Sequence, residues 1–304
     1  MSDAPPLLGL LTSYADGPRT VGRVLDNAVA YGLPLIVDSG AFTAHSTGRP
    51  INLAEHTAYI NDRKAAPRVR WVGLDVIGNA EATRRNWLHQ RSHDAPVEPT
   101  IHYGADPAEV DKYVRAGLAT GADGQAWINL GGIVAQTKRP SNHPKIAAWC
   151  AAVARRLPEG VKVHGLGCTP PPLNRLFGYD SIDSIYWQAT IVRHRHLSLF
   201  DPLLGDWRIF YVNHTNPTQR ATSWRGAHRH GRFLRRQYGT TPAEIVDGPD
   251  ATLKRLAMRS HATMAAYLRQ RHGTALVIHL AGASGPQIPW VAEEAHAQQG
   301  ATTA

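Results

Sequence analysis

The first two thirds of the chain alternate short β-branched runs with longer amphipathic stretches, and this alternation restricts the folds open to it. Seven runs predict strands, at residues 7–11, 35–37, 71–76, 97–102, 126–130, 161–166 and 182–187. The stretches between them predict six helices, at residues 19–31, 52–64, 80–91, 107–119, 144–157 and 170–178. Strands and helices that alternate at this spacing form a parallel sheet. A doubly wound sheet and a (β/α)8 barrel both satisfy the periodicity.

Polar residues and glycines at the strand ends favour the barrel. They are Asp38-Ser39-Gly40, Asp75, His102, Gly131-Gly132, Gly165-Leu166-Gly167 and Asp183. In a (β/α)8 barrel such ends converge on one mouth, whereas a doubly wound sheet concentrates its site at one switch point. We therefore predict an α/β fold, a TIM-like (β/α)8 barrel that forms a single catalytic domain over residues 1–304. Either residues 208–212 or residues 275–280 supply the eighth strand.

Composition excludes several classes of protein. The 304 residues are 43% hydrophobic and 19% charged, which excludes general disorder, and the absence of any apolar run of about 18 residues excludes a membrane-spanning helix. The opening MSDAPPLLGLLTSYADG lacks the basic region of a signal peptide. Cys150 and Cys168 are the only cysteines, too few for a disulfide framework or a four-cysteine zinc site. We expect a soluble cytoplasmic protein.

The net charge of +9 is concentrated in one segment. Residues 191–240, called the basic segment below, hold nine arginines and two aspartates, a net +7, which leaves +2 for the other 254 residues. Five histidines and two tryptophans, Trp207 and Trp224, are interleaved with the arginines. Arginines mixed with aromatic rings are typical of surfaces that contact phosphates and stack on bases, although a solvated helix face has a similar composition.

We predict that the basic segment is an insertion near the C-terminal strands that binds nucleic acid. The candidate contact residues are Arg193, Arg195, Arg220, Arg225, Arg229, Arg232, Arg235 and Arg236.

Three aspartates carry the candidate chemistry: Asp38 in LIVDSGAF, Asp75 in WVGLDVIG and Asp183 in DSIDSIYW. A carboxylate at the end of an apolar strand is desolvated, which raises its pKa and suits it to acid or base chemistry. Each one alone could simply cap the next helix. Three at one mouth supply a nucleophile, a proton-transfer group and a base-recognition group for a double displacement at a sugar carbon.

Six motifs, taken in order, resemble the tRNA-guanine transglycosylases. They are IVDSGAFTAHS, similar to the family's DSGGFQ segment, then WVGLDVI, PTIHYGADPAEVDKYVRAG, INLGGIV, VHGLGCTPPPLNRLFGYDSID, and YDSIDSIYWQAT, similar to the family's nucleophile segment. The resemblance covers roughly residues 33–190.

The resemblance implies a role for each candidate residue. Asp183 would be the nucleophile that attacks C1′ of a guanosine nucleotide, Asp38 the proton-transfer residue, and Asp75 the reader of the base. The backbone N–H groups of Ser39 and of Gly131 or Gly132 would line the base pocket, where glycine allows close approach. Such a reaction needs no ATP or redox cofactor, and the target base must leave its stack.

Several positions depart from the family pattern. His102 stands where the family has a glutamine, and Asp180 competes with Asp183 as a nucleophile candidate. Contacts from Arg193 and Arg195 to phosphate are a looser inference, because the family's run after the nucleophile is missing. The family's three-cysteine, one-histidine zinc site cannot be built without a cysteine after Cys168, so we predict no metal site.

The missing zinc site, the compact chain of 304 residues and the basic segment together resemble a related branch that places 7-deazaguanines into DNA and includes phage-encoded proteins. A phage-encoded member would act in the cytoplasm of its host. We therefore predict exchange of guanine in DNA for a 7-deazaguanine of the preQ0 type, with DNA and the free base as partners and no membrane. Exchange in tRNA is the first alternative. A non-catalytic nucleic-acid-binding barrel is the second, and a glycoside hydrolase, which shares the paired carboxylates, is the third.

Overall fold

The computed structural model describes residues 8–121, 124–168, 170–184, 195–212, 216–280, 289 and 291–294. Among these residues, no helix is both long and apolar enough to cross a membrane.

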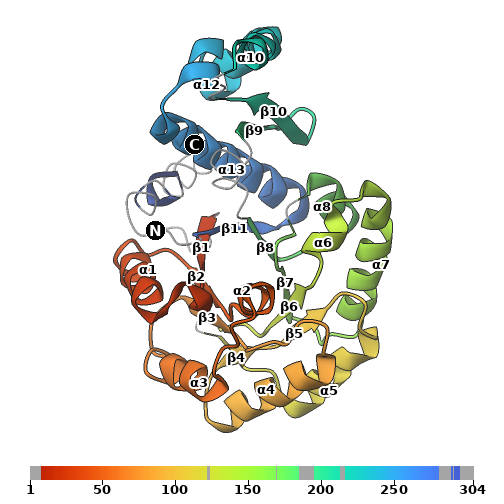
Figure 1. Cartoon of the computed structure of the whole chain (residues 1–304). Helices are drawn as coiled ribbons and strands as arrows, with labels where there is room; N and C mark the ends of the chain where they lie inside the picture. The colour runs from red at the N-terminus through yellow and green to blue at the C-terminus, as the bar shows by residue number, and fades with distance from the viewer. Residues whose placement is uncertain are drawn as a thin grey trace.

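One parallel sheet of nine strands organises the molecule (Figure 1). In chain order the strands are β1 Leu8–Ser13, β2 Leu35–Asp38, β3 Val69–Val72, β4 Val97–Glu98, β5 Thr100–His102, β6 Trp127–Gly131, β7 Lys162–Gly165, β8 Ser181–Ser184 and β11 Ala275–His279. Their order in the sheet is β4-β3-β2-β1-β11-β8-β7-β6-β5. The order never reverses, so the doubly wound alternative is excluded.

The two ends of the sheet meet at a proline. Only Pro99 separates β4 from β5 along the chain, and proline has no N–H group to continue the ladder. The Glu98 carbonyl still accepts a hydrogen bond from Gly73 N, and the Pro99 carbonyl accepts one from Asn129 N, both at 2.9 Å. The sheet is therefore a nearly closed barrel, broadly TIM-like. Residues 275–279, and not 208–212, supply its last strand.

Helices follow most strands and lie around the sheet. Those predicted from the periodicity are α1 Pro18–Ala30, α3 Leu53–Asn61, α4 Ala80–Ser92, α5 Val110–Ala116, α7 His143–Ala154 and α8 Pro171–Leu176. Two short helices, α2 Ala41–Thr47 and α6 Val134–Thr137, were not predicted, and the short 3-10 helices are η1 Tyr14–Asp16, η2 Pro107–Glu109 and η3 Pro140–Asn142. Asn52 and Asn79 cap α3 and α4 by accepting hydrogen bonds from main-chain N–H groups.

The strand register determines which side chains face the interior of the barrel. Leu11, Ile36, Val72 and Val277 form a separate small buried cluster, as expected of a barrel interior. Because side chains alternate along a strand, the residues two positions further on share this face. Asp38 and His279 therefore point inward at the C-terminal end of the barrel, and Asp183, the register partner of Val277, faces the same way.

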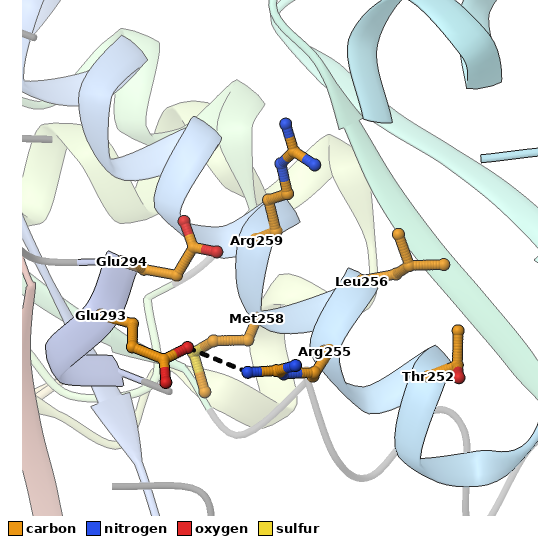
Figure 2. Close-up of a pocket in the computed structure, with 7 residues that line it drawn as sticks. All are labelled: Thr252, Arg255, Leu256, Met258, Arg259, Glu293 and Glu294. Atoms are coloured by element: carbon orange, nitrogen blue, oxygen red, sulfur yellow. Dashed lines mark hydrogen bonds and ion pairs between the residues drawn. The ribbon is translucent and has the colours of Figure 1, made fainter. Parts of the chain in front are cut away.

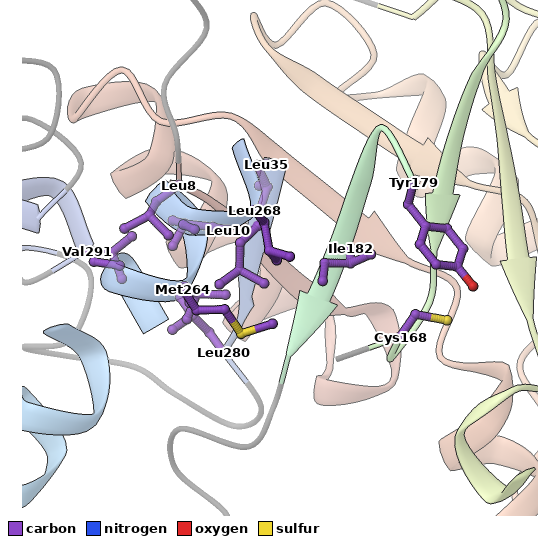
Figure 3. Packing of buried hydrophobic residues seen from close by; sticks show 14 of the residues in the cluster. Leu8, Leu10, Leu35, Cys168, Tyr179, Ile182, Met264, Leu268, Leu280 and Val291 are labelled. Carbon is purple, nitrogen blue, oxygen red and sulfur yellow. The ribbon is translucent and has the colours of Figure 1, made fainter. Parts of the chain in front are cut away.

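The outer faces of the strands belong to a second, larger core that the helices cover (Figure 3). Leu8 and Leu10 of β1 lie in this core with Met264 and Leu268 of α13 (Asp250–His272). The same cluster continues into residues of the basic segment, including Phe200 and Phe210.

The basic segment folds as a hairpin and helices inserted between β8 and β11. Strands β9 (His196–Asp201) and β10 (Asp206–Tyr211) are antiparallel. They are followed by α10 Pro217–Arg229, α11 Gly231–Phe233 and the π-helix η4 Leu234–Tyr238; α12 Pro242–Asp247 comes just after the basic segment. Ser260 of α13 accepts a hydrogen bond from Phe200 N at 2.7 Å, and Tyr238 donates to the Phe200 carbonyl at 2.6 Å. The first bond attaches the basic segment to α13, and the second joins two parts of the segment itself.

Candidate functional site

The three predicted aspartates gather at the C-terminal mouth of the barrel. Asp75 and Asp183 are buried and Asp38 is partly buried. Burial, then the negative charge of Asp75 and more weakly that of Asp183, raises the pKa of Asp38 to about 7, against hydrogen bonds from main-chain N–H groups such as Gly40 N at 3.0 Å. A carboxyl group that titrates near neutral pH can both give and take a proton.

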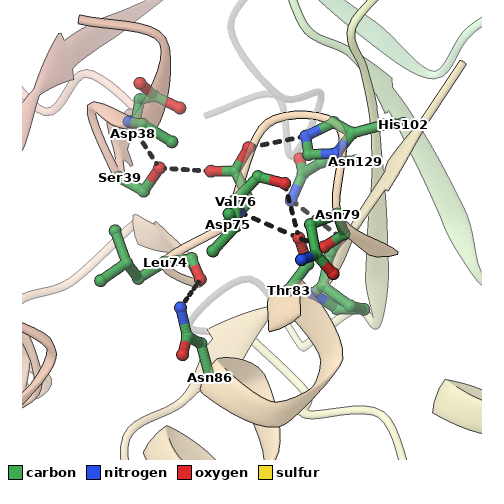
Figure 4. A network of polar contacts seen from close by, with 12 residues as sticks. Asp38, Ser39, Leu74, Asp75, Val76, Asn79, Thr83, Asn86, His102 and Asn129 are labelled. Carbon is green, nitrogen blue, oxygen red and sulfur yellow. Dashed lines mark hydrogen bonds and ion pairs between the residues drawn. The ribbon is translucent and has the colours of Figure 1, made fainter. Parts of the chain in front are cut away.

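Asp75 is held by two side chains, one on each of its oxygens (Figure 4). Ser39 donates its hydroxyl to Asp75 Oδ1 at 2.6 Å, and His102 donates Nε2–H to Oδ2 at 2.7 Å. Ser39 directly follows β2, and His102 ends β5. The sequence-predicted residues Ser39, Asp75 and His102 are therefore brought together in one buried network.

The loop that carries Asp75 is fixed by side chains of α4. Thr83 accepts a hydrogen bond from Val76 N at 2.9 Å, Gln90 accepts one from Leu74 N at 2.8 Å, and Asn86 donates to the Leu74 carbonyl at 3.1 Å. The main chain on both sides of Asp75 is thus bonded to the helix that follows it, as Figure 4 shows for Thr83 and Asn86. This support keeps the carboxylate in one orientation.

Asp183 is held by the loop that follows β7. Gly167 donates its main-chain N–H to Asp183 Oδ1 at 2.6 Å. Gly167 has a φ of +68°, and a Cβ there would lie 2.4 Å from Val134 Cγ2, so the donor's position requires glycine. Oδ2 of Asp183 lies 3.9 Å from Nδ1 of His279.

Asp180, the competing nucleophile candidate, lies at the opposite end of β8. Its carboxylate accepts hydrogen bonds from Lys162 Nζ at 3.0 Å and Val163 N at 2.8 Å. Lys162 begins β7, so these contacts belong to the N-terminal end of the barrel. Asp180 has a structural role there, and the register favours Asp183 for the mouth.

Of the predicted pair, Gly131 ends β6 at the same mouth and Gly132 follows it. Gly131 is the register partner of His102, and a Cβ on Gly131 would lie 3.0 Å from Thr100 Cγ2 and 3.2 Å from His102 Cδ2. A larger residue would therefore push His102 away from Asp75.

Two histidines beside Asp183 were missed from the sequence. Fully buried His164 has its Nε2 3.5 Å from Asp183 Oδ1, and His279 contacts the other oxygen. Burial lowers the pKa of both imidazoles, so both are neutral at pH 7. The alternation VHGLG could have placed His164 on the interior face, and His279 could have been found once residues 275–279 were assigned as a strand.

Seven of the eight predicted arginines are described, and all seven are exposed; Arg193 lies outside the described residues. Arg220 makes a bidentate ion pair with Asp247 at 2.8 and 2.9 Å, and Arg225 donates to Thr222 at 3.3 Å. Five of the seven make neither an ion pair nor a side-chain hydrogen bond within the described residues: Arg195, Arg229, Arg232, Arg235 and Arg236. These five side chains are the ones most available to an anionic partner.

One cavity and the two cysteines supply none of the candidate catalytic groups. A cavity of about 450 Å³ lies between α13 and residues 293–294, where Arg255 pairs with Glu293 at 3.0 Å (Figure 2). Its two arginines, Arg255 and Arg259, face two glutamates, so it has no excess charge.

Cys150 and Cys168 are fully buried, and burial raises the pKa of both thiols. Neither thiol is therefore suited to act as a thiolate nucleophile.

The resemblance to tRNA-guanine transglycosylases stays a prediction that rests on the motifs. Comparisons of the chain with family models, with curated proteins and with solved structures found no match.

Proposed function

We propose that this protein exchanges guanine in DNA for a 7-deazaguanine base through a covalent link between Asp183 and the nucleotide. The observation that carries the proposal is the convergence of three aspartates from three strands on one mouth, each in a different environment. Asp183 is oriented by a main-chain donor, Asp75 is held by two side chains, and Asp38 titrates near neutral pH.

In the first step, Asp183 Oδ2 attacks C1′ of the target nucleotide and the C1′–N9 bond breaks. The departing guanine takes its proton from the neutral carboxyl of Asp38. In the second step, the carboxylate of Asp38 takes the N9 proton of the incoming base, N9 bonds to C1′, and the bond to Asp183 breaks. Two inversions retain the configuration at C1′, and Asp38 ends as it began, so no further reactant is needed.

Asp75 is suited to read the base. Each of its oxygens already accepts one hydrogen bond, and each has a second acceptor site. These free sites can accept from N1–H and the exocyclic amine of guanine, a pattern that adenine does not offer. His102 replaces the glutamine of the resembled family, and its ring holds Asp75 in this orientation.

The decisive assay follows a radiolabelled 7-deazaguanine base of the preQ0 type into nucleic acid. The protein is incubated with the base and either duplex DNA or tRNA, without ATP, and the nucleosides are separated after digestion. We expect label in DNA, with one guanine released for each base inserted. Label in tRNA alone would contradict the DNA assignment, and a free sugar product without insertion would favour a glycoside hydrolase.

Binding of DNA by the basic segment is tested by its salt dependence. Replacing both Arg235 and Arg236 with glutamine removes two exposed charges that make no ion pair within the described residues. If each contacts a phosphate, the slope of log affinity against log salt becomes shallower by about 1.8. The matched control replaces two exposed arginines on the far helices of the barrel, Arg115 and Arg155. Equal slopes for the two double variants, measured by fluorescence anisotropy, would exclude this binding surface.

A further inference from the structure

The fully buried imidazole of His164 lies beneath Asp183 and takes no part in the two proposed steps of base exchange. His164 on β7 and Ser181 on β8 are register partners, and Asp183 is two residues beyond Ser181 on the same face. Ser181 Oγ lies 2.7 Å from His164 Nδ1, while His164 Nε2 lies 3.5 Å from Asp183 Oδ1. Nε2 makes no hydrogen bond within the described residues, which is uncommon for a buried polar atom.

The surroundings select one tautomer of His164. If Nδ1 carried the proton, the lone pair of Nε2 would point at a carboxylate oxygen and be repelled. The Ser181 hydroxyl can rotate to donate to Nδ1, and the proton then resides on Nε2, facing Asp183. The other charged groups that influence His164 are Arg70 and Glu98, which form a bidentate ion pair with each other at 2.6 and 2.8 Å. Asp183 is thus the acceptor left for the Nε2 proton.

We propose that His164 is a positioning residue that donates Nε2–H to Asp183 Oδ1 when the substrate is bound. This inference rests on the proposed function. Hydrogen bonds at catalytic sites are often long in the free protein and tighten in the complex. With Gly167 N already on Oδ1, a second donor there leaves Oδ2 as the attacking atom.

The same donors assist the second step. After attack, Oδ2 is bonded to C1′ and Oδ1 is the carbonyl oxygen of an ester. When the incoming N9 displaces the ester, the electron pair of the C1′–Oδ2 bond returns to the carboxylate. Donors already aimed at Oδ1 stabilise this developing charge without reorganisation.

Variants of His164 separate donation from packing. His164→Phe keeps the ring but has no donor, whereas His164→Gln carries an N–H group at a similar reach. We expect His164→Phe to lower kcat for exchange by about 100-fold and leave KM for the base within about threefold. His164→Gln is expected to recover to within about tenfold of the wild type, and Ser181→Ala to lose about fivefold because the tautomer is less constrained.

Two further measurements exclude a merely structural effect. The acid limb of the pH profile of kcat, which reports the substrate complex, is expected to move to higher pH in His164→Phe, because the Asp183 carboxylate has lost a donor there. His143→Phe is the matched control: His143 is also buried, its Nε2 bonds the Thr137 carbonyl at 3.0 Å, and we expect its loss to leave this profile unchanged. Exchange by His164→Phe within about threefold of the wild type, with the same profile, would overturn the proposal.

A spectroscopic measurement tests the proposal even if no exchange is found. In ¹⁵N NMR of the wild-type protein at pH 7, we expect His164 to be the neutral Nε2–H tautomer and its Nε2 shift to change in Asp183→Asn. A protonated Nδ1 would overturn the role of His164. Absence of exchange by the wild type, with the expected tautomer present, would contradict the proposed function alone.

Discussion

Replacing Asp183 with asparagine is expected to lower the rate of base exchange by about 10⁴-fold or more, about 5.5 kcal/mol of transition-state stabilisation. Asparagine has nearly the same shape, and its amide oxygen can still accept from Gly167 N. It lacks the negative charge and the nucleophilic oxygen that the first step needs. Because the exposed arginines are unchanged, affinity for DNA is expected to stay within about threefold.

Asp180→Asn is the matched control, since it makes the same chemical change at the residue just before the same strand, β8. Asp180 bonds Lys162 and Val163 at the N-terminal end of the barrel, so its loss affects stability and not the mouth. Single-turnover exchange on a duplex oligonucleotide measures both variants. If Asp183→Asn kept its activity while Asp180→Asn lost it, the register assignment would be wrong. If both kept it, the barrel would be a binding protein or use another nucleophile.

Replacing Asp38 with asparagine is expected to change activity and stability in opposite directions. Exchange should fall by about 10³-fold, because an amide cannot transfer the proton. At pH 8 the free energy of unfolding should rise by about 2–4 kcal/mol, because the variant no longer keeps a buried charge at the mouth. Asparagine can still accept the hydrogen bond from Gly40 N.

The direction of this change in the free energy of unfolding follows from the raised pKa of Asp38. Its value is about 7 in the folded protein and near 3.8 when unperturbed, so the folded state holds the proton more tightly. The tighter binding of this proton stabilises the folded wild type fully below about pH 4, relative to high pH, and this stabilisation is lost as the pH rises through about 7. We therefore expect wild type and Asp38→Asn to be equally stable near pH 4 and to diverge up to pH 8.

Urea unfolding at pH 4, 6 and 8 measures this divergence. A constant difference between the two proteins at all three pH values would show that Asp38 is only a structural cap. A variant less stable than the wild type at pH 8 would contradict the burial argument directly.

The barrel and its three aspartates could be predicted because they follow from the local pattern. Alternating apolar runs place each strand; Asp38 ends β2, Asp75 lies three residues beyond β3, and Asp183 is the third of the four residues of β8. The last strand could not be assigned, because residues 208–212 and 275–280 both contain short apolar runs with β-branched residues. Tertiary contacts decide between them: β10 pairs with β9 alone, while β11 pairs with β1 and β8.

The neighbours of the aspartates were harder to predict, since they depend on register. His164 and Ser181 become partners only when β7 and β8 pair as they do, and His279 approaches Asp183 only through β11. The basic segment was identified by its charge, but its fold was not predicted. Its hairpin is stabilised by long-range contacts such as Phe200 N to Ser260 Oγ, which no local pattern encodes.

The most direct test of the central claim is the mass of the protein after a short incubation with a guanine-containing DNA duplex, without an incoming base. Denaturation and digestion should yield the Asp183 peptide linked through its carboxylate to a DNA fragment that has lost guanine. The link should be absent in Asp183→Asn, present in Asp180→Asn, and released when a 7-deazaguanine base is added before denaturation. A link on Asp180, or guanine release and base insertion with no link at any residue, would contradict the account.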